Sequence, residues 1–410
     1  MVVANFVEIS QRVAAMKHSD ARILTTHVGS LIRPSEFVAI LKAIDAGDAQ
    51  AARAYPDRLR EAVAKIVREQ ANVGIDVVTD GEFGKSASWS RYILERLTGF
   101  EQRTSIGLKT GEIVAIGRDR ERFPEFYAEY DKTQGFVGTK GNWACIGPIT
   151  YRGHDLIRRD IENLKSALKS VEVAETFMAA VAPGSVVPDR LNEYYNNDSD
   201  FIFAVADSLN EEYRAIVDAG FLLQVDDAHL PIMYERMVPP ATFSDYLAWA
   251  DLRIEALNRA LKGIAEDRVR YHLCWGSWNA PHTSDVPLKD IVHLLLRLRI
   301  GAYSIEAANA RHEHEWRVWE TVKLPAQKVL IPGVISHATN VVEHPELVAE
   351  RIIRFARLVG RENVIAGTDC GFAQGPYVQR VHPSIMWSKL QALVEGAQLA
   401  TNHLWHRKAP

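Results

Sequence analysis

The chain has 410 residues, of which 47% are hydrophobic and 24% are charged, and its formal net charge is −4. A chain of this length can bury one large core, and α/β barrels with insertions often have this length. The weakly acidic balance lacks the electrostatic footprint of a protein that binds nucleic acid or an anionic membrane, so we expect a small-molecule substrate.

The cysteine content indicates a reducing compartment. The three cysteines, Cys145, Cys274 and Cys370, are too few for a disulfide framework. The first residues lack the basic and then apolar pattern of a signal peptide, and no apolar run reaches the roughly 18 residues of a membrane span. We therefore expect a cytoplasmic protein without a membrane segment, and the sequence leaves a homo-oligomer open.

Strand-like and helix-like runs alternate along the chain, which predicts βα units and a parallel sheet. Amphipathic helices, with apolar residues three and four apart, are expected at 57–73, 210–219, 246–265, 288–298 and 345–359. The barrel strands are expected near 22–28, 75–80, 177–182, 221–226, 269–274, 302–306, 328–334 and 363–369. The predicted fold is an α/β protein, a (β/α)8 TIM barrel that forms a single domain over residues 1–410.

One interval is far longer than the roughly 30 residues of a βα unit. Between the second and third predicted strands lie two further strand-like runs, 112–116 and 143–146, and a helix-like run near 160–168. Counting a further barrel strand here would give nine, so we predict that residues 100–170 are an inserted hairpin and helix over the barrel mouth. The charged stretch 118–132 is expected to be a mobile loop or a solvated face.

Four residues have the types and spacing of one zinc site. His272 and Cys274 are two apart in a predicted strand, so their side chains point to the same side. Glu306 ends a strand-like run one βα unit later, and Cys370 ends another after two more units. A lone His-x-Cys pair in a buried strand usually serves only to pack the core. The prediction of a metal site therefore depends on Glu306 and Cys370 at the ends of two further strands. Imidazole, thiolate and carboxylate ligands suit Zn²⁺ better than Mg²⁺ or Ca²⁺.

A second stretch is rich in ligand-type residues. The run Arg311-His-Glu-His-Glu-Trp316 lacks the His-Glu-x-x-His spacing that places two histidines on one helical face. We expect it to begin the helix after the sixth strand, with its acids near the helix N-terminus.

Several segments resemble the cobalamin-independent methionine synthase family, specifically its catalytic C-terminal barrel in a short form without the N-terminal half. The epoxyalkane:coenzyme M transferase is a related member. The resemblance covers residues 22 to 375 approximately and is carried by His272-Leu-Cys274, Ser304-Ile-Glu306, Gly367-Thr-Asp-Cys-Gly371, Thr25-Thr-His-Val-Gly-Ser30, Asp80-Gly-Glu82, Gln224-Val-Asp-Asp227 and Ile331-Pro-Gly-Val334.

The resemblance implies roles for residues at the strand ends, where barrel enzymes carry their active sites. The acids matching Glu82 and Asp226 hold the ammonium of homocysteine, and the backbone around the serine matching Ser30 holds its carboxylate. Glu306 matches the zinc ligand that moves aside when the thiol binds. The predicted catalytic residues are therefore Glu306, Asp226 and Glu82, and the predicted substrate-binding residues are Ser30, Glu82 and Asp226.

The predicted ligand set also suits a particular chemistry. Two thiolates and one carboxylate give a Zn²⁺ site a net charge of −1, which makes it a poor Lewis acid for water. Such a site activates a substrate thiol as a zinc thiolate that stays nucleophilic enough to attack an alkyl group. We therefore predict a zinc-dependent thiol S-methyltransferase that acts on homocysteine, as 5-methyltetrahydropteroyltriglutamate-homocysteine S-methyltransferases do.

Departures from the family pattern leave the methyl or alkyl donor open. Glu82 is followed by Phe-Gly-Lys-Ser rather than Pro-Glu-Arg-Asn. The alternative function is zinc-dependent alkyl transfer to another thiol, such as coenzyme M, whose sulfonate calls for cations; Arg33, Lys85 and Arg91 are available. A third hypothesis is a non-enzymatic metal-binding barrel. It is disfavoured because structural zinc sites are usually formed by residues close in sequence and are closed, whereas these ligands come from three predicted strands.

Two carboxylates in a partly dry pocket repel each other unless a cation is present. An amino-acid thiol would bring that cation to Glu82 and Asp226, whereas a thiol sulfonate would not. On this argument we predict that homocysteine binds better than a thiol sulfonate.

Overall fold

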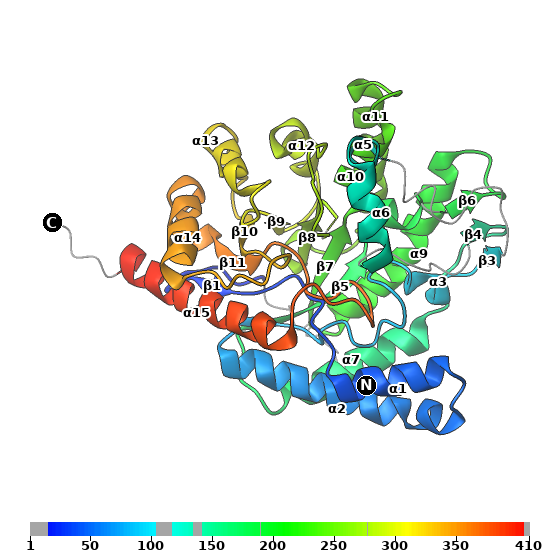
Figure 1. Ribbon diagram of the computed structural model, residues 1–410, viewed down its shortest axis with the longest axis horizontal. Helices are drawn as coiled ribbons and strands as arrows, with labels where there is room; N and C mark the ends of the chain where they lie inside the picture. The colour runs from blue at the N-terminus through cyan, green and yellow to red at the C-terminus, as the bar shows by residue number, and fades with distance from the viewer. Residues whose placement is uncertain (1–14, 104–116, 134–141, 189, 277, 406–410) are drawn as a thin grey trace, which may run out of the picture.

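The computed structural model describes residues 15–103, 117–133, 142–188, 190–276 and 278–405. Eight parallel strands form one sheet in the order β1-β11-β10-β9-β8-β7-β5-β2. A parallel bridge between Thr26 and Val77 joins the first and last strands of that order, so the sheet curls into a nearly closed barrel (Figure 1). The strands are β1 (Leu24–Thr25), β2 (Val77–Val78), β5 (Glu175–Val181), β7 (Leu222–Asp227), β8 (Val269–Leu273), β9 (Ala302–Ile305), β10 (Val329–Ile335) and β11 (Ile365–Thr368).

The predicted TIM barrel is confirmed, and each of its eight expected strands overlaps an observed one. The strands read as short apolar runs because a parallel barrel is covered on both faces. Every residue of β7, β8, β9 and β10 is buried, for example. Their carboxyl ends therefore lie at one rim, where the residues after each strand meet.

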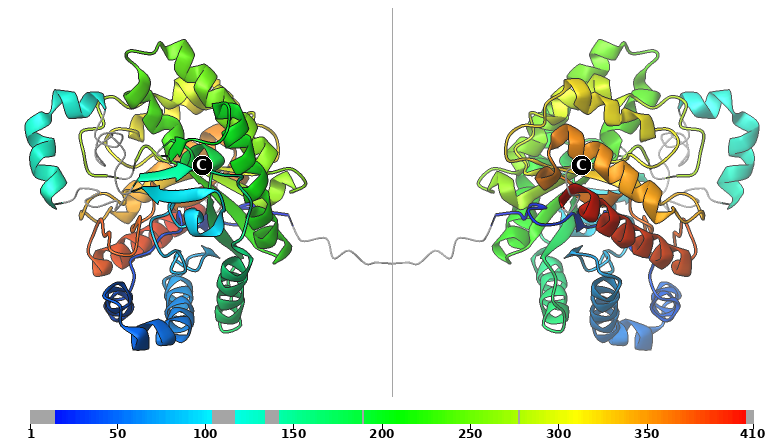
Figure 2. Two further views of the ribbon diagram at one scale, coloured as in Figure 1. Left: turned by 90° about the vertical axis from the view of Figure 1, so that its right-hand side faces the viewer. Right: turned by 90° about the vertical axis from the view of Figure 1, so that its left-hand side faces the viewer.

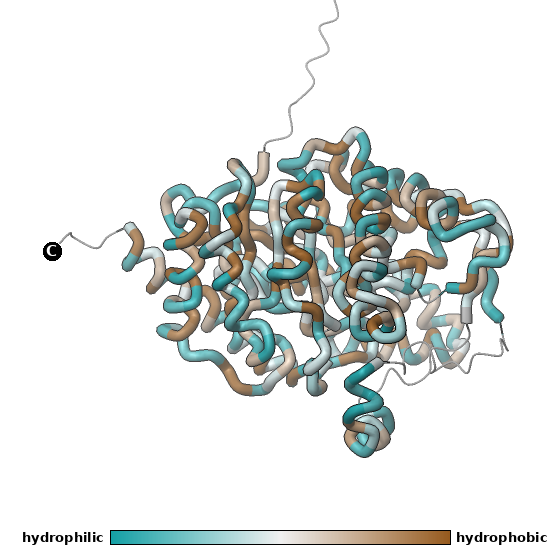
Figure 3. The backbone as a smooth tube through the Cα atoms, turned by 90° about the horizontal axis from the view of Figure 1, so that it is seen from above, coloured by the Kyte–Doolittle hydropathy of each residue, from teal (hydrophilic) through white to brown (hydrophobic). Residues whose placement is uncertain are grey.

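Within the described ranges, a helix follows each barrel strand and packs outside it (Figure 2). Brown and teal alternate along these helices in Figure 3, as expected of helices with one face on the barrel. In chain order they are α2 (Ala49–Val73), α7 (His154–Leu168), α9 (Asp198–Asp218), α11 (Phe243–Ala260), α12 (Leu288–Leu295), α13 (Val318–Thr321), α14 (Pro345–Val359) and α15 (Pro383–Trp405). The described part of the chain contains no helix long and apolar enough to cross a membrane.

Local sequence signals set the ends of these helices. The Asp48 carboxylate accepts hydrogen bonds from the backbone N–H groups of Gln50 and Ala51 and so caps the start of α2. The same helix ends at Gly74, whose φ of 97° is a left-handed conformation that glycine adopts without steric cost. Helix α11 begins with a capping box between Thr242 and Asp245.

Shorter helices occupy the loops. They are α1 (Ser35–Asp45), α3 (Ile93–Arg96), α5 (Arg118–Arg122), α6 (Pro124–Thr133), α8 (Pro183–Val186) and α10 (His229–Met237), together with the 3₁₀ turns η1 (Glu266–Arg268), η2 (Glu313–Arg317) and η3 (Arg361–Asn363). The run predicted to begin the helix after the sixth strand does so, as η2 followed by α13.

Residues 100–170 contain both a small sheet and a barrel helix. Strand β3 (Phe100–Arg103) pairs antiparallel with β4 (Asn142–Cys145), which pairs parallel with β6 (Arg190–Asn192), so the run at 143–146 is not a barrel strand. The strand-like run at 112–116 lies outside the described residues. Helix α7 packs against α2 and α9 and so takes the place of the barrel helix after β2. The division into one domain with a 100–170 insertion over the mouth stays a prediction.

The charged stretch expected as a mobile loop or a solvated face forms α5 and α6, in which only Asp119 and Tyr127 are buried among the side chains described, so the solvated face is the alternative that agrees with the structure. Arg120 pairs with Asp131 at 2.8 Å and lies 4.3 Å from the centre of the Tyr127 ring. Asp119 accepts a 2.7 Å hydrogen bond from the backbone N–H of Thr283, which fastens α5 to the loop after β8. The loop expectation was wrong because contacts between the two helices, and the contact of α5 with the distant Thr283, stabilise a helical conformation.

Candidate metal centre

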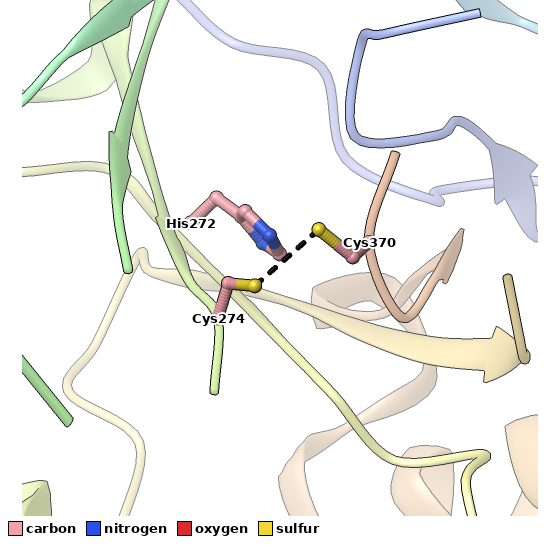
Figure 4. Close-up of side chains that lie close together, drawn as sticks. All are labelled: His272, Cys274 and Cys370. Atoms are coloured by element: carbon pink, nitrogen blue, oxygen red, sulfur yellow. Dashed lines mark hydrogen bonds between the residues drawn. The ribbon is translucent and has the colours of Figure 1, made fainter. Parts of the chain in front are cut away.

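Three of the four predicted zinc ligands come together at the carboxyl ends of β8 and β11. His272 lies on β8, Cys274 follows that strand directly, and Cys370 follows β11. Their side chains point toward one another (Figure 4), and their potential ligand atoms all lie within 4.8 Å of each other. The Cys274 and Cys370 sulfurs are 3.4 Å apart, which is too far for a disulfide bond of about 2.05 Å.

The donor atoms of this group fit a zinc ion. His272 Nδ1 lies 3.2 Å from Ser304 Oγ, whereas its Nε2 is buried and makes no hydrogen bond. When Nδ1–H donates to the serine, Nε2 carries a lone pair, which is the form of imidazole that binds a metal. A buried polar atom without a partner is rare in a folded protein, and one nitrogen beside two sulfurs is a donor set that Zn²⁺ prefers.

Electrostatics couple the three side chains. The hydrogen bond between the sulfurs lowers the pKa of Cys370 well below its usual value and, together with burial, raises that of Cys274. Burial acts to lower the pKa of His272, but the adjacent Cys370 sulfur reverses this, so the net direction is upward. The cluster therefore favours an anionic sulfur at Cys370, and a bound cation would stabilise the anionic form of both sulfurs.

Glu306, the fourth predicted ligand, directly follows β9 but is not part of this group. Its Oε1 accepts a 3.0 Å hydrogen bond from the backbone N–H of Trp275, and its Oε2 accepts a 2.7 Å hydrogen bond from Asn309. Asp369 accepts hydrogen bonds from the backbone N–H groups of Ala307 and Ala308, so it ties the loop of Glu306 to that of Cys370. Glu306 as a ligand stays a prediction.

A cavity of about 390 Å³ opens beside the three ligands, within the range of small-molecule sites. Ser30, Glu82 and Asp226 line it together with His272, Cys274 and Cys370, and Glu306 does not. The register across β7, β8 and β9 aligns Asp226 with His272 and His272 with Ser304, which explains why strand-end residues share this wall. All predicted substrate-binding residues thus face the same cavity as the candidate ligands.

The two predicted substrate acids already have partners from the chain. Glu82 forms a buried 2.9 Å ion pair with Lys85, and its own φ of 63° is rare outside glycine. The side-chain amide of Gln224 donates a 2.7 Å hydrogen bond to Asp226. Burial, and then Glu82, raise the pKa of Asp226 to about 7, whereas Lys85 opposes that rise. The predicted preference for an amino-acid thiol assumed that these carboxylates lack a cation in the protein. Lys85 supplies that cation to Glu82.

Ser30 lies against the loop that follows Cys370. A Cβ atom on Gly371 would lie 1.9 Å from Ser30 Oγ, so only glycine fits there. The backbone carbonyl of Ser30 accepts a 2.8 Å hydrogen bond from the N–H of Phe372. Ser30 thus has a structural role, and its substrate-binding role stays a prediction.

Sequence reasoning missed the outer wall of the cavity. Trp89, Trp278, Tyr377 and Val378 line it, together with Arg236. A signal was present, because the segment from Gly371 to Tyr377 contains two glycines and a proline directly after a ligand cysteine. Loops that follow barrel strands often carry binding residues.

Comparison with known proteins yields relatives that align over nearly the full chain. No protein-family model matches the sequence. The 2-hydroxypropyl-CoM lyase of Xanthobacter autotrophicus is 24% identical over 417 residues, which cover 95% of this chain and 98% of the relative. A methionine synthase of Saccharolobus islandicus is 25% identical over 394 residues, which cover 93% of this chain and 95% of the relative.

Two solved structures share the fold. A B12-independent methionine synthase from Shewanella sp. W3-18-1, in complex with selenomethionine, superposes with a TM-score of 0.66 at 18% identity and covers 94% of this chain and 100% of its own. A putative vitamin-B12 independent methionine synthase from Listeria monocytogenes gives 0.63 at 19% identity, with coverages of 92% and 98%. The chain is therefore a homologue of the methionine synthases and of 2-hydroxypropyl-CoM lyase, and it has the fold of the B12-independent methionine synthases.

Proposed function

We propose that this protein is a zinc-dependent thiol alkyltransferase, in which His272, Cys274 and Cys370 hold the metal and Glu306 is the fourth ligand. The observation that carries the proposal is the buried His-Cys-Cys group at the wall of a cavity, with an unpaired imidazole nitrogen beside two close sulfurs. A closed structural site would not open onto a cavity of small-molecule size.

Zinc, when bound, would lower the pKa of an acceptor thiol so that its sulfur is anionic near neutral pH. The chain supplies the rest. Ser304 orients the imidazole, and the backbone N–H of Gly276 donates a 3.2 Å hydrogen bond to Cys274 Sγ. These contacts hold the donor atoms in place before the substrate arrives.

The Glu306 carboxylate has a second set of partners, the Trp275 N–H and Asn309. This supports a role as an exchangeable ligand, because a carboxylate that leaves the metal would find its hydrogen bonds already in place. Apolar and aromatic lining, including Val28, Trp89, Ile232 and Trp278, limits water at the reacting sulfur.

Two acceptors are consistent with the relatives. Methyl transfer to homocysteine, with Glu82, Asp226 and Ser30 at the substrate, corresponds to the relatives named methionine synthase. Alkyl transfer to another thiol corresponds to 2-hydroxypropyl-CoM lyase. The Lys85 ion pair favours the second class, because it neutralises Glu82 without a substrate ammonium. Small-molecule partners and a cytoplasmic location are parts of this proposal.

The test combines metal content with product formation. Purified protein grown with zinc is analysed for metal and incubated with a panel of thiols and, separately, a methyl donor and an epoxide, and thioether products are measured by mass spectrometry. We expect one zinc per chain and a thioether that forms only when zinc is present. Less than about half an equivalent of zinc, or equal product after zinc removal, would reject the proposal.

A further inference from the structure

Lys85 lies behind the acidic wall of the metal-facing cavity, where it contacts Glu82 without lining the cavity itself. Its Nζ lies 2.9 Å from Glu82 Oε2, and the exposed fractions of the two side chains are only 8% and 6%. Nζ also lies 4.6 Å from the centre of the Tyr92 ring, a cation–π contact. The ammonium of Lys85 is therefore a built-in cation directly behind the candidate substrate site.

The surrounding structure keeps Lys85 in this place. Its backbone N–H donates a 3.2 Å hydrogen bond to the Glu82 carbonyl, and its own carbonyl accepts a 3.1 Å hydrogen bond from Arg33. The Tyr92 ring is fixed in turn by a 2.8 Å hydrogen bond from its hydroxyl to Glu212. Displacing Lys85 would leave a buried ammonium and a buried carboxylate without partners, at a large cost.

The other acids of the cavity wall are also engaged. Asp227 accepts hydrogen bonds from Ser185 at 2.6 Å, Tyr271 at 3.1 Å and the Leu230 N–H at 3.3 Å. Asp226 accepts one from Gln224. An incoming ammonium would thus meet two partly engaged carboxylates, Glu82 and Asp226, together with the like charge of Lys85 in a poorly screened site.

The remaining charged groups on the wall are mainly cationic. Arg91 and Arg236 are among the residues that line the cavity. A thiol that ends in an anionic group therefore encounters favourable charge there, and a thiol that ends in an ammonium does not.

Building on the proposed function, we propose that Lys85 is the residue that determines acceptor specificity. Its ammonium neutralises Glu82 from behind the cavity wall and so disfavours thiols that carry an amino group. The preferred acceptor is a small thiol with an anionic tail and no ammonium, a mercaptoalkanoate or a mercaptoalkanesulfonate.

The test uses a matched pair of ligands on the zinc-loaded protein. Homocysteine and 4-mercaptobutyrate differ only in the amino group, and calorimetric titration at one pH compares their dissociation constants without any alkyl donor. We expect 4-mercaptobutyrate to bind at least as tightly as homocysteine. A third titration with 2-mercaptoethanesulfonate shows which anionic tail is preferred, and either order between the two anionic thiols supports the proposal if both match or exceed homocysteine.

Two variants test whether the ligand preference depends on the ion pair between Lys85 and Glu82. In Lys85→Met, which removes the charge and keeps most of the side-chain length, we expect the affinity ratio to move at least tenfold toward homocysteine, because Glu82 then needs a cation. In the double variant Lys85→Met/Glu82→Gln, neither charge remains, and most of that shift should disappear. The double variant also serves as the folded control should an unpaired Glu82 prevent Lys85→Met from folding.

The outcomes separate this inference from the function on which it rests. A wild-type protein that binds homocysteine tenfold more tightly than 4-mercaptobutyrate overturns the role of Lys85 and leaves the thiol function standing. An unchanged ratio in a folded Lys85→Met does the same. Zinc-loaded protein that binds none of the three thiols rejects the proposed function and this inference together.

Discussion

Two clusters of ligand-type residues lie at the same rim of the barrel, and only one resembles a metal site. In the first, His272, Cys274 and Cys370 leave a ring nitrogen and two sulfurs facing each other beside a cavity. In the second, His282, Asp285, His312 and Glu315 pair all their donors within the protein.

The second cluster is an internal salt bridge. Asp285 Oδ2 lies 3.0 Å from one ring nitrogen of His282 and 3.0 Å from one of His312. The remaining nitrogen of His312 faces Glu315 at 3.0 Å, and that of His282 faces the Trp278 carbonyl at 2.9 Å. All four nitrogens thus face acceptors, so both rings are suited to carry two protons, a form that cannot bind a metal. Ligand-type residues become a site only where their donor atoms are left without partners.

The largest expected effect is a loss of bound zinc when the first cluster is changed. Cys370→Ser should remove most of the zinc and all thiol binding, because it takes away one of the two sulfurs. Cys145→Ser is the matched control, since Cys145 is buried on β4 away from the group, and it should keep one zinc per chain. Metal analysis of both purified variants checks this, and equal zinc in the two would break the comparison.

The next effect concerns stability without metal. Asp285→Asn removes the carboxylate that two rings share, and loss of one partner from a buried ion pair costs about 3–5 kcal/mol. The free energy of unfolding, measured with urea, should fall by that order while zinc content stays at one equivalent. Loss of zinc with unchanged stability would mean that the second cluster binds metal after all.

A smaller effect tests the orientation of the ligand imidazole. Ser304→Ala removes the partner of His272 Nδ1, and loss of such an outer contact weakens metal binding by about 10- to 100-fold. The control is Ser284→Ala, whose hydroxyl donates to Asp119 near the second cluster and should leave zinc affinity unchanged. Competition with a chelator measures both affinities.

The smallest effect is a pH dependence. Burial acts to lower the pKa of His282, but its hydrogen bond with Asp285 raises it to about 8, from an ordinary value of 6.5. A raised pKa stabilises the fold fully below pH 6.5, and this contribution is lost as the pH rises through about 8. The loss by pH 9 should be about 1–2 kcal/mol. Unfolding at pH 6 and pH 9 should show it in the wild type. His282→Gln should reduce the difference without abolishing it, because the burial of His312 is outweighed by its hydrogen bonds with Asp285 and Glu315, which raise its pKa to about 10, so His312 loses stability over the same range.

The sequence by itself determined the barrel and the grouping of His272, Cys274 and Cys370 at its rim. Each strand is a local apolar run bounded by turn residues, and βα spacing alone brings the strand ends to one rim. His272 and Cys274 share a side because side chains alternate along a strand. These features depend on residues close together in the chain, so local pattern suffices to predict them.

Only the tertiary structure decided which charges meet. From the sequence, Lys85 could bind a substrate sulfonate or form an ion pair with Glu82. In the structure, the turn at Glu82 and the Tyr92 ring place its ammonium in the ion pair. The second cluster joins His282 to His312 through a contact between separate loops. Helix α5 likewise depends on a distant partner, Thr283. Such pairings are set by the packing of segments far apart in sequence, and the free energy of burying each charge depends on neighbours that no local pattern specifies.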